Sequence, residues 1–402
     1  MVSTFQTRKL GELVTFKTGK LDSNAAVPNG NYPFFTCSQE TLRTNTFSFD
    51  TECVLLAGNN ANGIFPLKYF QGKFDAYQRT YVVRPRDTEE LTTKFLYYAL
   101  RLKLDEFRSF STGAATKFLT LTILNDTEIQ APPLPIQRRI AGILSAYDEL
   151  IENSQRRIKI LESMARALYR EWFVHFRFPG HESVPRVPSS LGEIPQGWEA
   201  STLGAYLSSL ESGKRPKGGI REVEDGVPSI GAENINGIGK HDFTGEKFIP
   251  RAFFQEMRKG IVRDRDVAIY KDGAYIGKSS YFRDGFPHLE CCVNEHVFLL
   301  RASGVRLRQN ALYLWLQEPD TVQTIRSKNA NAAQPGINQQ TVGGLELTLP
   351  DSQTAEQFDQ LVDPLLAEVI NLAKKIQNLR RTRDLLLPRL LSGQIDVEAI
   401  PT

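Results

Sequence analysis

A long apolar seam occurs twice in this chain of 402 residues. Apolar side chains recur at steps of four and three along residues 135–173, where Ser154 interrupts them, and again along residues 358–390, where Arg383 interrupts them. The seam residues are Ile140, Leu144, Tyr147, Ile151, Ile158, Leu161, Leu168 and Trp172, and then Phe358, Val362, Leu365, Val369, Leu372, Ile376, Leu379, Leu386 and Leu390. This rhythm is typical of coiled-coil helices, each of which buries its apolar stripe against a partner. We therefore predict two long helices that pair with each other, most simply antiparallel.

The length of the seams favours this pairing over two helices that each pack on their own domain. A helix of about 36 residues is roughly 54 Å long, whereas an average globular helix has about 11 to 12 residues. Proline interrupts the second seam at Asp363-Pro364, because it lacks a backbone donor and clashes with the preceding turn. We expect the helix either to begin near Pro364, with Asp363 as its cap, or to be kinked there. Pro388 predicts a further bend before the last turn.

The two halves of the chain also repeat each other at a period of about 216 residues. Residues 10–11 and 18–20 (LG and TGK) correspond to residues 203–204 and 212–214 (LG and SGK). A strand-like run, a helix-like run and a final β-like run follow in each half. Short β-rich runs, at residues 53–56, 79–83, 266–270 and 297–300, are separated by Gly and Asn turns. We predict an α+β fold with two mixed domains in pseudo-twofold tandem repeat. The predicted segments are residues 1–132 (first mixed domain), 133–175 (first helix), 176–197 (loop or linker), 198–350 (second mixed domain) and 351–402 (second helix and C-terminal tail).

Composition excludes several classes of protein. A hydrophobic content of 41% supplies ordinary globular cores. The four cysteines have no CxxC spacing and no nearby histidine pattern, which argues against a zinc site and a disulfide framework. Neither a signal peptide nor an apolar run long enough to cross a membrane occurs, so we expect a soluble, cytoplasmic protein. A net charge of +3 is too small to coat DNA by charge alone, so any DNA binding must come from local loops.

No catalytic motif stands out in the sequence. An adenine methyltransferase needs an Asn or Asp before its Pro-Pro-aromatic motif, and the Pro132-Pro133 pair follows Ala131 instead. Residues 272–279 (DGAYIGKS) miss the P-loop spacing by one residue, so a glycine-rich strand turn presenting Lys278 is favoured over a phosphate-binding loop. The five histidines are scattered without metal-ligand spacing. We predict no catalytic residues, no metal site and no cofactor on this chain.

A duplicated chain with a reading domain at either end of a paired-helix rod suits duplex DNA, the commonest ligand with two-ended symmetry. The order of the sequence features also carries a specific resemblance. It consists of a mixed domain, LPIQRRIAGILSAYDELIENSQRRI at residues 134–158, REWF at 170–173, GEIPQGW at 192–198, a second mixed domain, and LLLPRLLSGQI at 385–395. Over nearly the whole chain, this order resembles the DNA specificity subunit of type I restriction-modification systems.

The resemblance implies that each mixed domain is a target-recognition domain for one half of a split double-stranded DNA target. The helices would set the gap between the halves and dock two modification subunits, which carry the S-adenosylmethionine. Restriction subunits would join through the modification subunits. The resemblance leaves the target sequence, the gap length and the number of partner copies open.

Candidate DNA contacts are the amide and cationic side chains of Gly- and Asn-rich loops, since Arg, Lys, Asn and Gln read base edges and phosphates. In the first domain they are Lys20, Asn59, Asn60, Asn62, Arg79 and Lys117. In the second they are Lys214, Arg215, Lys217, Lys271, Lys278, Lys328, Asn331 and Gln334. Ordinary surface turns have the same composition, which is the competing interpretation of every one of these residues.

Three hypotheses follow from the sequence. The leading one is a non-catalytic specificity subunit. The second is a protein-interaction scaffold with two duplicated binding domains, and a salt-dependent gel shift on duplex DNA distinguishes it from the first. The third is a specificity module that acts with a fused-type restriction enzyme, and the sizes of co-purifying partners would identify it.

Overall fold

The chain forms two compact units in the computed structural model, which describes residues 5–61, 63–113, 116–216, 223, 226–273, 275–328 and 336–399. Unit 1 comprises Met1–Leu150 and Leu379–Thr402, and unit 2 comprises Ile151–Asn378. These units differ from the predicted segments because each long helix contributes one part to each unit. Within the described residues, no helix combines the length and apolarity needed to cross a membrane.

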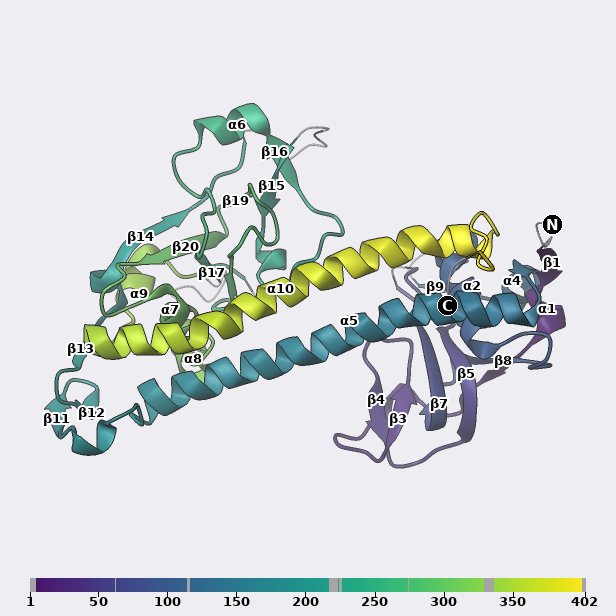
Figure 1. Ribbon diagram of the computed structural model, residues 1–402, viewed down its shortest axis with the longest axis horizontal. Coiled ribbons are helices and arrows are strands. Elements are labelled where there is room, and N and C mark those ends of the chain that lie inside the picture. Colours follow the sequence, from purple (N-terminus) through teal and green to yellow (C-terminus); the bar gives the residue numbers. More distant parts are fainter. Residues whose placement is uncertain are drawn as a thin grey trace. The chain divides into compact units, whose positions relative to one another are not determined.

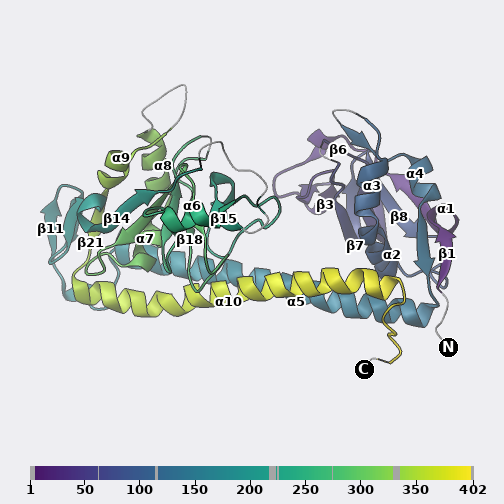
Figure 2. The same cartoon turned by 90° about the horizontal axis from the view of Figure 1, so that it is seen from above.

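Unit 1 is built on a six-stranded sheet of order β2-β8-β5-β7-β3-β4 (Figure 1). Only β3 and β7 are parallel neighbours in it. Its strands are β2 (Val14–Thr18), β3 (Tyr32–Phe35), β4 (Leu42–Thr44), β5 (Phe49–Ala57), β7 (Leu67–Ala76) and β8 (Thr80–Pro85). Two short antiparallel pairs are β1 (Gln6–Lys9) with β10 (Glu128–Ala131) and β6 (Asn59–Asn60) with β9 (Lys117–Phe118). The helices are η1 (Ser23–Ala25), α1 (Leu10–Leu13), α2 (Thr93–Leu102), α3 (Leu104–Phe110) and α4 (Leu121–Asp126), and α1, α4 and β1 lie together at one edge of the unit (Figure 2).

Both faces of this sheet are buried, which explains the continuous apolar run in β5. Val54 and Leu56 belong to a core shared with α2, whereas Cys53 and Leu55 face a second core with Phe74. A strand covered on both faces has no solvent side and therefore needs no polar alternation. The strands predicted at residues 53–56 and 79–83 are confirmed as β5 and β8.

Unit 2 contains a four-stranded sheet of order β14-β20-β17-β18 and a three-stranded sheet of order β16-β15-β19. The strands are β14 (Leu207–Ser212), β15 (Gly226–Ile230), β16 (Phe248–Pro250), β17 (Val267–Tyr270), β18 (Ser279–Tyr281), β19 (Cys292–Val293) and β20 (Val297–Ala302). A further antiparallel pair joins β13 (Glu199–Thr202) to β21 (Glu346–Leu349). The helices are η4 (Leu203–Tyr206), η5 (Ala232–Asn234), α6 (Arg251–Glu256), α7 (Gln309–Trp315), α8 (Pro319–Ser327) and α9 (Gln339–Gly343).

The two units share one topology, as the repeat predicts. The antiparallel order β2-β8-β5-β7 of unit 1 recurs as β14-β20-β17-β18 in unit 2, and β4-β3-β7 recurs as β16-β15-β19 with the same parallel pair. The matched Leu-Gly motifs also occupy equivalent places. The Leu10 amide donates to the Thr127 carbonyl at 2.8 Å, and the Leu203 amide donates to the Leu345 carbonyl at 2.7 Å.

The long helices are α5 (Leu134–Tyr169) and α10 (Ser352–Leu391). Every predicted seam residue is buried or half-buried. In unit 2, Arg157 of α5 contacts Glu368 of α10 at 2.8 Å, and Tyr169, one end of α5, packs on Phe358 with ring centroids 6.1 Å apart. A later residue of α5 thus contacts an earlier residue of α10, so the helices run antiparallel within unit 2.

The polar residues that interrupt the seams are buried as well. Ser154 is 2% exposed and Arg383 is 7% exposed. In unit 1, Arg383 Nη1 donates to Asp148 Oδ1 at 2.5 Å, while the Tyr98 hydroxyl donates to Asp148 Oδ2 at 2.8 Å. A buried guanidinium is tolerated when it is paired and hydrogen-bonded in this way. The interruption at Arg383 is therefore a paired charge inside the helix contact of unit 1.

The second helix does not begin near Pro364, as one of the two predicted alternatives had it, because α10 is helical from Ser352. Its N-terminal amides are satisfied by Asp351, whose carboxylate accepts from the amides of Gln353 and Thr354 at 3.0 and 2.9 Å. Burial favours a raised pKa for Asp351, but the hydrogen bonds from Thr354 and Gln353 outweigh it and leave the pKa below its usual value. Asp363 is therefore no cap.

The side chain of Asp363 serves tertiary contacts instead. It accepts from Arg283 Nη1 at 3.1 Å and Asn310 Nδ2 at 2.9 Å, and Arg265 lies 2.8 Å away. These contacts anchor the turn that contains Pro364, where the helix lacks one backbone hydrogen bond. Helical structure also continues through Pro388.

The segment predicted as a loop or linker, residues 176–197, contains a β-hairpin of β11 (Arg186–Ser189) and β12 (Gly192–Pro195), after the short helix η3 (His181–Ser183). The Ser189 hydroxyl donates to the Gly192 carbonyl at 2.6 Å and closes the turn. Before it, α5 ends in a π-helical turn, η2 (Arg170–Val174). An aromatic cluster follows, in which Trp198 stacks on Phe178 with centroids 5.2 Å apart.

Candidate nucleic-acid interface

The matched glycines, Gly19 and Gly213, mark the same close backbone contact in each unit. Gly19 follows β2, and a Cβ atom there would lie 1.7 Å from the Ala76 carbonyl oxygen at the end of β7. Gly213 follows β14, and its Cβ would lie 1.5 Å from the Val293 carbonyl oxygen at the end of β19. Only glycine permits this approach. Lys20 and Lys214 therefore leave the fold at equivalent positions, and both are exposed.

Unit 1 brings four of its predicted DNA-contact residues together. Strand β6 places Asn59 and Asn60 directly opposite Phe118 and Lys117 of β9. The guanidinium of Arg79 lies over the Phe118 ring, 5.6 Å from its centroid, and this ring is 37% exposed. The Asn59 side-chain oxygen accepts from Cys37 Sγ at 3.0 Å, which fixes the amide. Amides, cations and an exposed ring thus share one surface, while Asn62 lies outside the described residues.

Unit 2 builds the equivalent surface after β17. The Ile337 amide donates to the Lys271 carbonyl at 2.9 Å, and Asp272 forms a bridge with Gly336, in the place that β6 and β9 occupy in unit 1. The Lys271 ammonium lies over the Phe298 ring, 4.9 Å from its centroid. Lys328, at the end of α8, is exposed. Lys217, Asn331 and Gln334 lie outside the described residues.

The described residues of the glycine-rich run, 272–273 and 275–279, form a hairpin turn between β17 and β18, as the favoured interpretation predicts. The Gly277 amide donates to the Tyr270 carbonyl at 3.0 Å, and an antiparallel strand follows where a P-loop needs a helix N-terminus. The turn presents Lys278, whose ammonium lies 4.3 Å from the centroid of the Tyr275 ring, itself 58% exposed. Each unit therefore offers a cation next to an exposed aromatic ring.

Acidic side chains pair with basic side chains on this surface of unit 2 and reduce its positive charge. The sequence analysis missed these acidic partners. Arg215 pairs with Glu295 at 2.9 Å, and His296 Nδ1 lies 2.9 Å from Asp272. The sequence analysis found no metal-ligand spacing around any of the histidines, His296 included. The pairings join positions that are distant along the chain, and no local spacing signals them.

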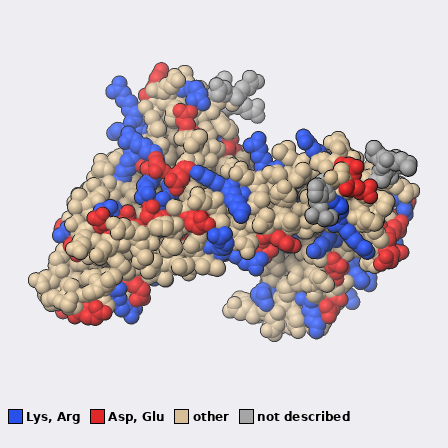
Figure 3. Space-filling view, in the orientation of Figure 1, with Lys and Arg blue, Asp and Glu red and all other residues tan. Residues whose placement is uncertain are grey.

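The distribution of exposed charges supports the prediction that any DNA binding comes from local loops. On the face shown in Figure 3, Lys and Arg are interspersed with Asp and Glu. Base reading requires placed donors and acceptors, which such a surface can present without a large basic patch. The arrangement of amides, cations and rings suits recognition of nucleic acid.

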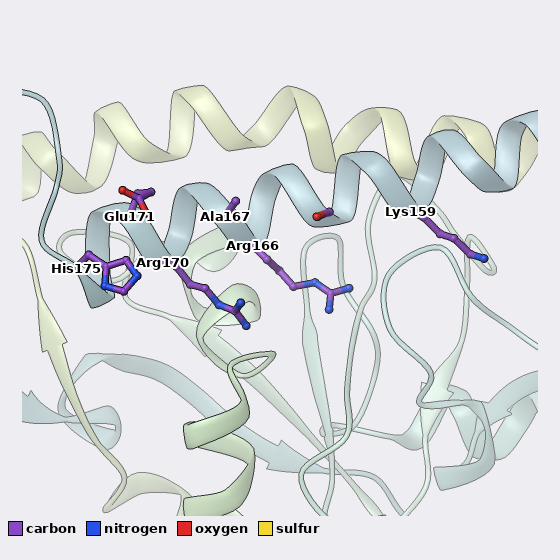
Figure 4. A pocket seen from close by; sticks show the side chains of 7 residues that line it. Lys159, Arg166, Ala167, Arg170, Glu171 and His175 are labelled. Carbon is purple, nitrogen blue, oxygen red and sulfur yellow. The ribbon is translucent and has the colours of Figure 1, made fainter. Parts of the chain in front are cut away.

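A separate basic hollow of about 370 Å³ lies on α5 and its π-helical turn. Figure 4 shows Lys159, Arg166 and Arg170 extending from one side of the helix, with His175 at its end. Arg170 pairs with Glu318 at 2.9 Å, and Arg166 lies 3.8 Å from Glu162. The sequence analysis considered only the apolar face of this helix and missed this surface.

Comparison with known proteins agrees with the resemblance. Residues 2–163 match the family model "Type I restriction modification DNA specificity domain". The EcoDI specificity subunit of Escherichia coli is 35% identical over 44% of this chain, which spans only 38% of that protein. The MjaIX specificity subunit of Methanocaldococcus jannaschii is 25% identical over 77% of this chain and 71% of its own length.

The fold has a solved relative. The crystal structure of a type I restriction-modification S subunit from M. genitalium superposes with a TM-score of 0.63 at 19% identity and covers 96% of both chains. It shows the same mixed helix-and-strand fold. The predicted resemblance to type I restriction-modification specificity subunits is therefore confirmed, with residues 2–163 matching the model of that family's DNA specificity domain.

Proposed function

We propose that this chain is the non-catalytic specificity subunit of a type I restriction-modification complex and that each unit reads one half of a bipartite double-stranded DNA target. The observation that carries the proposal is the repeated topology, with the same glycine contact at Gly19 and Gly213. A duplicated reading domain is what a split target requires, because each half-site needs its own set of base contacts. The loops around Asn59, Lys117, Lys271 and Lys278 supply those contacts.

The paired helices act as the spacer between the half-sites in this proposal. Their seam residues are buried or half-buried in each unit. The helices have 36 and 40 residues, which is far longer than packing on one small domain requires. Lengthening or shortening both helices together by whole turns would change the number of base pairs between the half-sites. The mixed domains would stand at either end of this antiparallel pair.

The methyl transfer belongs to partner subunits in this proposal. Two modification subunits dock on the helices and bring S-adenosylmethionine, and restriction subunits join through them in the cytoplasm. The hollow beside Lys159 and Arg166 is one available docking surface on α5. We expect the purified chain alone to transfer no methyl groups. The chain mixed with its modification subunit is expected to methylate adenine at a bipartite site.

A domain exchange tests the assignment of one half-site to each unit. We expect replacement of residues 1–130 by the corresponding segment of another specificity subunit to change one half of the methylated target and leave the other half and the gap intact. Genome-wide mapping of methylated adenine in cells expressing either chain with the modification subunit reads the result. A change in both halves, or methyl transfer by the chain alone, would contradict the proposal.

The Lys278→Ala variant should weaken DNA binding by a similar factor on all sequences. Lys278 is exposed on a turn and suits a phosphate contact, so we expect the slope of log affinity against log salt to decrease in magnitude by about 1. Fluorescence anisotropy between about 50 and 200 mM salt, with the modification subunit present, measures the slope. Lys375→Ala on α10 is the matched control, because Lys375 is also exposed and is not one of the candidate DNA-contact residues. Equal slopes for both variants would remove Lys278 from the interface.

A further inference from the structure

Unit 2 brings three potential metal ligands together that are far apart in the sequence. Glu246 Oε1 lies 2.5 Å from His241 Nε2 and 2.6 Å from His288 Nε2. One ligand atom from each residue falls within 4.8 Å of the other two. The three side chains belong to two loops, one between η5 and β16 and the other between β18 and β19. They converge on a single point from two directions.

The surroundings shield this cluster partly from water. The side chain of His241 is 2% exposed, that of Glu246 12% and that of His288 23%. The Phe243 ring packs against both imidazoles, with centroids 4.6 Å from His241 and 5.7 Å from His288. The partly open side at His288 leaves a route for an ion. A half-buried carboxylate therefore faces two imidazole nitrogens beside the Phe243 ring.

The loop that carries His288 is an addition to the shared topology. In unit 1 a single continuous strand, β7, pairs with both β5 and β3. In unit 2 the same role is divided between β18, which pairs with β17, and β19, which pairs with β15. The residues between β18 and β19 interrupt the strand and bring in His288. Unit 1 has no counterpart of this interruption within its described residues, so the cluster is not a by-product of the common fold.

Both loops of the cluster rest on the same part of α10. A Cβ atom on Gly239 would lie 3.1 Å from the Ala373 side chain and 3.2 Å from that of Val369. In the other loop, the Lys374 ammonium donates to the Asp284 carbonyl. A link between the loops would therefore also hold them together over residues 369–374 of the helix, all within unit 2.

The contacts within the cluster suit an ion in this place. A neutral imidazole is the form that ligates a metal. The Nε2 atoms of His241 and His288 both lie close to the same oxygen of Glu246. An ion bound among the three atoms would move them apart.

We propose that His241, Glu246 and His288 bind a divalent transition-metal ion of the zinc class, with a water molecule as the fourth ligand. Imidazole and carboxylate are borderline-to-hard ligands that suit Zn²⁺. Ligand atoms about 2.0–2.2 Å from tetrahedral zinc lie about 3.3 Å from each other. The nitrogen–oxygen pairs need to separate by only about 0.8 Å to reach this geometry. The ion joins the two loops and stabilises unit 2.

Zinc content of the full-length protein tests this site. The chain is stripped with a chelator, loaded with Zn²⁺ under reducing conditions, passed through a desalting column and analysed by mass spectrometry of its metals. We expect about one zinc ion per wild-type chain and a higher melting temperature with zinc than without it. Glu246→Gln, which keeps the size and one acceptor oxygen, and His288→Asn, at the most exposed ligand, should both lose the ion and the zinc-dependent rise.

Two controls keep the result unambiguous. His175→Asn removes an exposed histidine outside the cluster and should retain the zinc. Cys37→Ser removes the half-buried thiol, the least buried of the four cysteines, and should also retain it. Far-ultraviolet circular dichroism verifies that each variant is folded. The proposal is wrong if the wild type takes up no zinc, or if the folded Glu246→Gln and His288→Asn variants hold as much zinc as the wild type.

Discussion

The Phe358→Ala variant is expected to lose about 3–5 kcal/mol of the free energy of unfolding of unit 2, the usual cost of truncating a fully buried aromatic side chain. Phe358 is 0% exposed. Its ring meets Phe173 edge-on with centroids 4.6 Å apart and lies 5.5 Å from Trp172 and 6.1 Å from Tyr169. These residues bring the end of α5 against the start of α10. Removal of the ring leaves a cavity that rigid helices cannot close.

Urea denaturation followed by tryptophan fluorescence measures the loss, because Trp172 and Trp198 both belong to the surrounding aromatic cluster. Leu361→Ala is the matched control. It lies three residues further along the same helix with a side chain that is 47% exposed, so we expect a change below about 1 kcal/mol. If the two variants were equally stable, the seam would not be the main source of stability where the helices meet in unit 2.

The seam could be predicted because apolar periodicity reports local burial directly. Each residue needs only to share a stripe with the residues three and four positions away, and Ile140, Val362 and Val369 are all fully buried as a result. The repeat of TGK and SGK could also be predicted. The close backbone contact requires glycine at both places, so the same residue recurs in the sequence. Strands β5, β8, β17 and β20 followed from their apolar runs.

The start of α10 and the histidine cluster could not be predicted, for a different reason. Pro364 normally opposes a helix interior, yet contacts from Arg283, Arg265 and Asn310 to Asp363 hold the turn in place. His241 and His288 meet only because β15 pairs with β19 and the chain makes a detour before it. Such effects depend on which distant segments become neighbours, and local spacing carries no record of them.

The same limit applies to the candidate DNA contacts. The loops of Asn59, Lys117 and Lys271 were chosen for their amides and cations, and the fold does collect Asn59 with Lys117. The pairing of Arg215 with Glu295 could not be predicted from the sequence, because it depends on the position of the chain after β19 in the folded unit. An Arg that already holds a carboxylate must release it before it can bind a phosphate, so Arg215 is a weaker candidate than Lys278.

Alanine at Gly19 or Gly213 should each cost about 3 kcal/mol or more, and each should act on its own unit. The added methyl group would lie 1.7 Å from the Ala76 carbonyl oxygen in unit 1 or 1.5 Å from the Val293 carbonyl oxygen in unit 2. Both obstacles are backbone atoms at the ends of sheet strands, so the paired strands themselves must shift. Side-chain rotation cannot relieve the clash.

Hydrogen exchange read by mass spectrometry shows where each variant is destabilised. Gly19→Ala should speed exchange in peptides of β2 and β7, and Gly213→Ala in peptides of β14 and β19, with little change in the other unit. Under the proposed function, Gly19→Ala should also weaken recognition of the half-site read by unit 1. Unit 2 should keep its base preferences for the half-site that it reads.

Gly142→Ala separates this steric effect from the general cost of replacing glycine. Gly142 is exposed in the N-terminal third of α5, and a Cβ there meets nothing within 4 Å. Alanine favours the helix over glycine, so we expect this variant to gain about 0.5–1 kcal/mol. A tolerated alanine at either Gly19 or Gly213 would break the equivalence between the two backbone contacts, and a loss at Gly142 would show that the cost is not specific to them. The duplicated recognition unit would then lose its sharpest structural support.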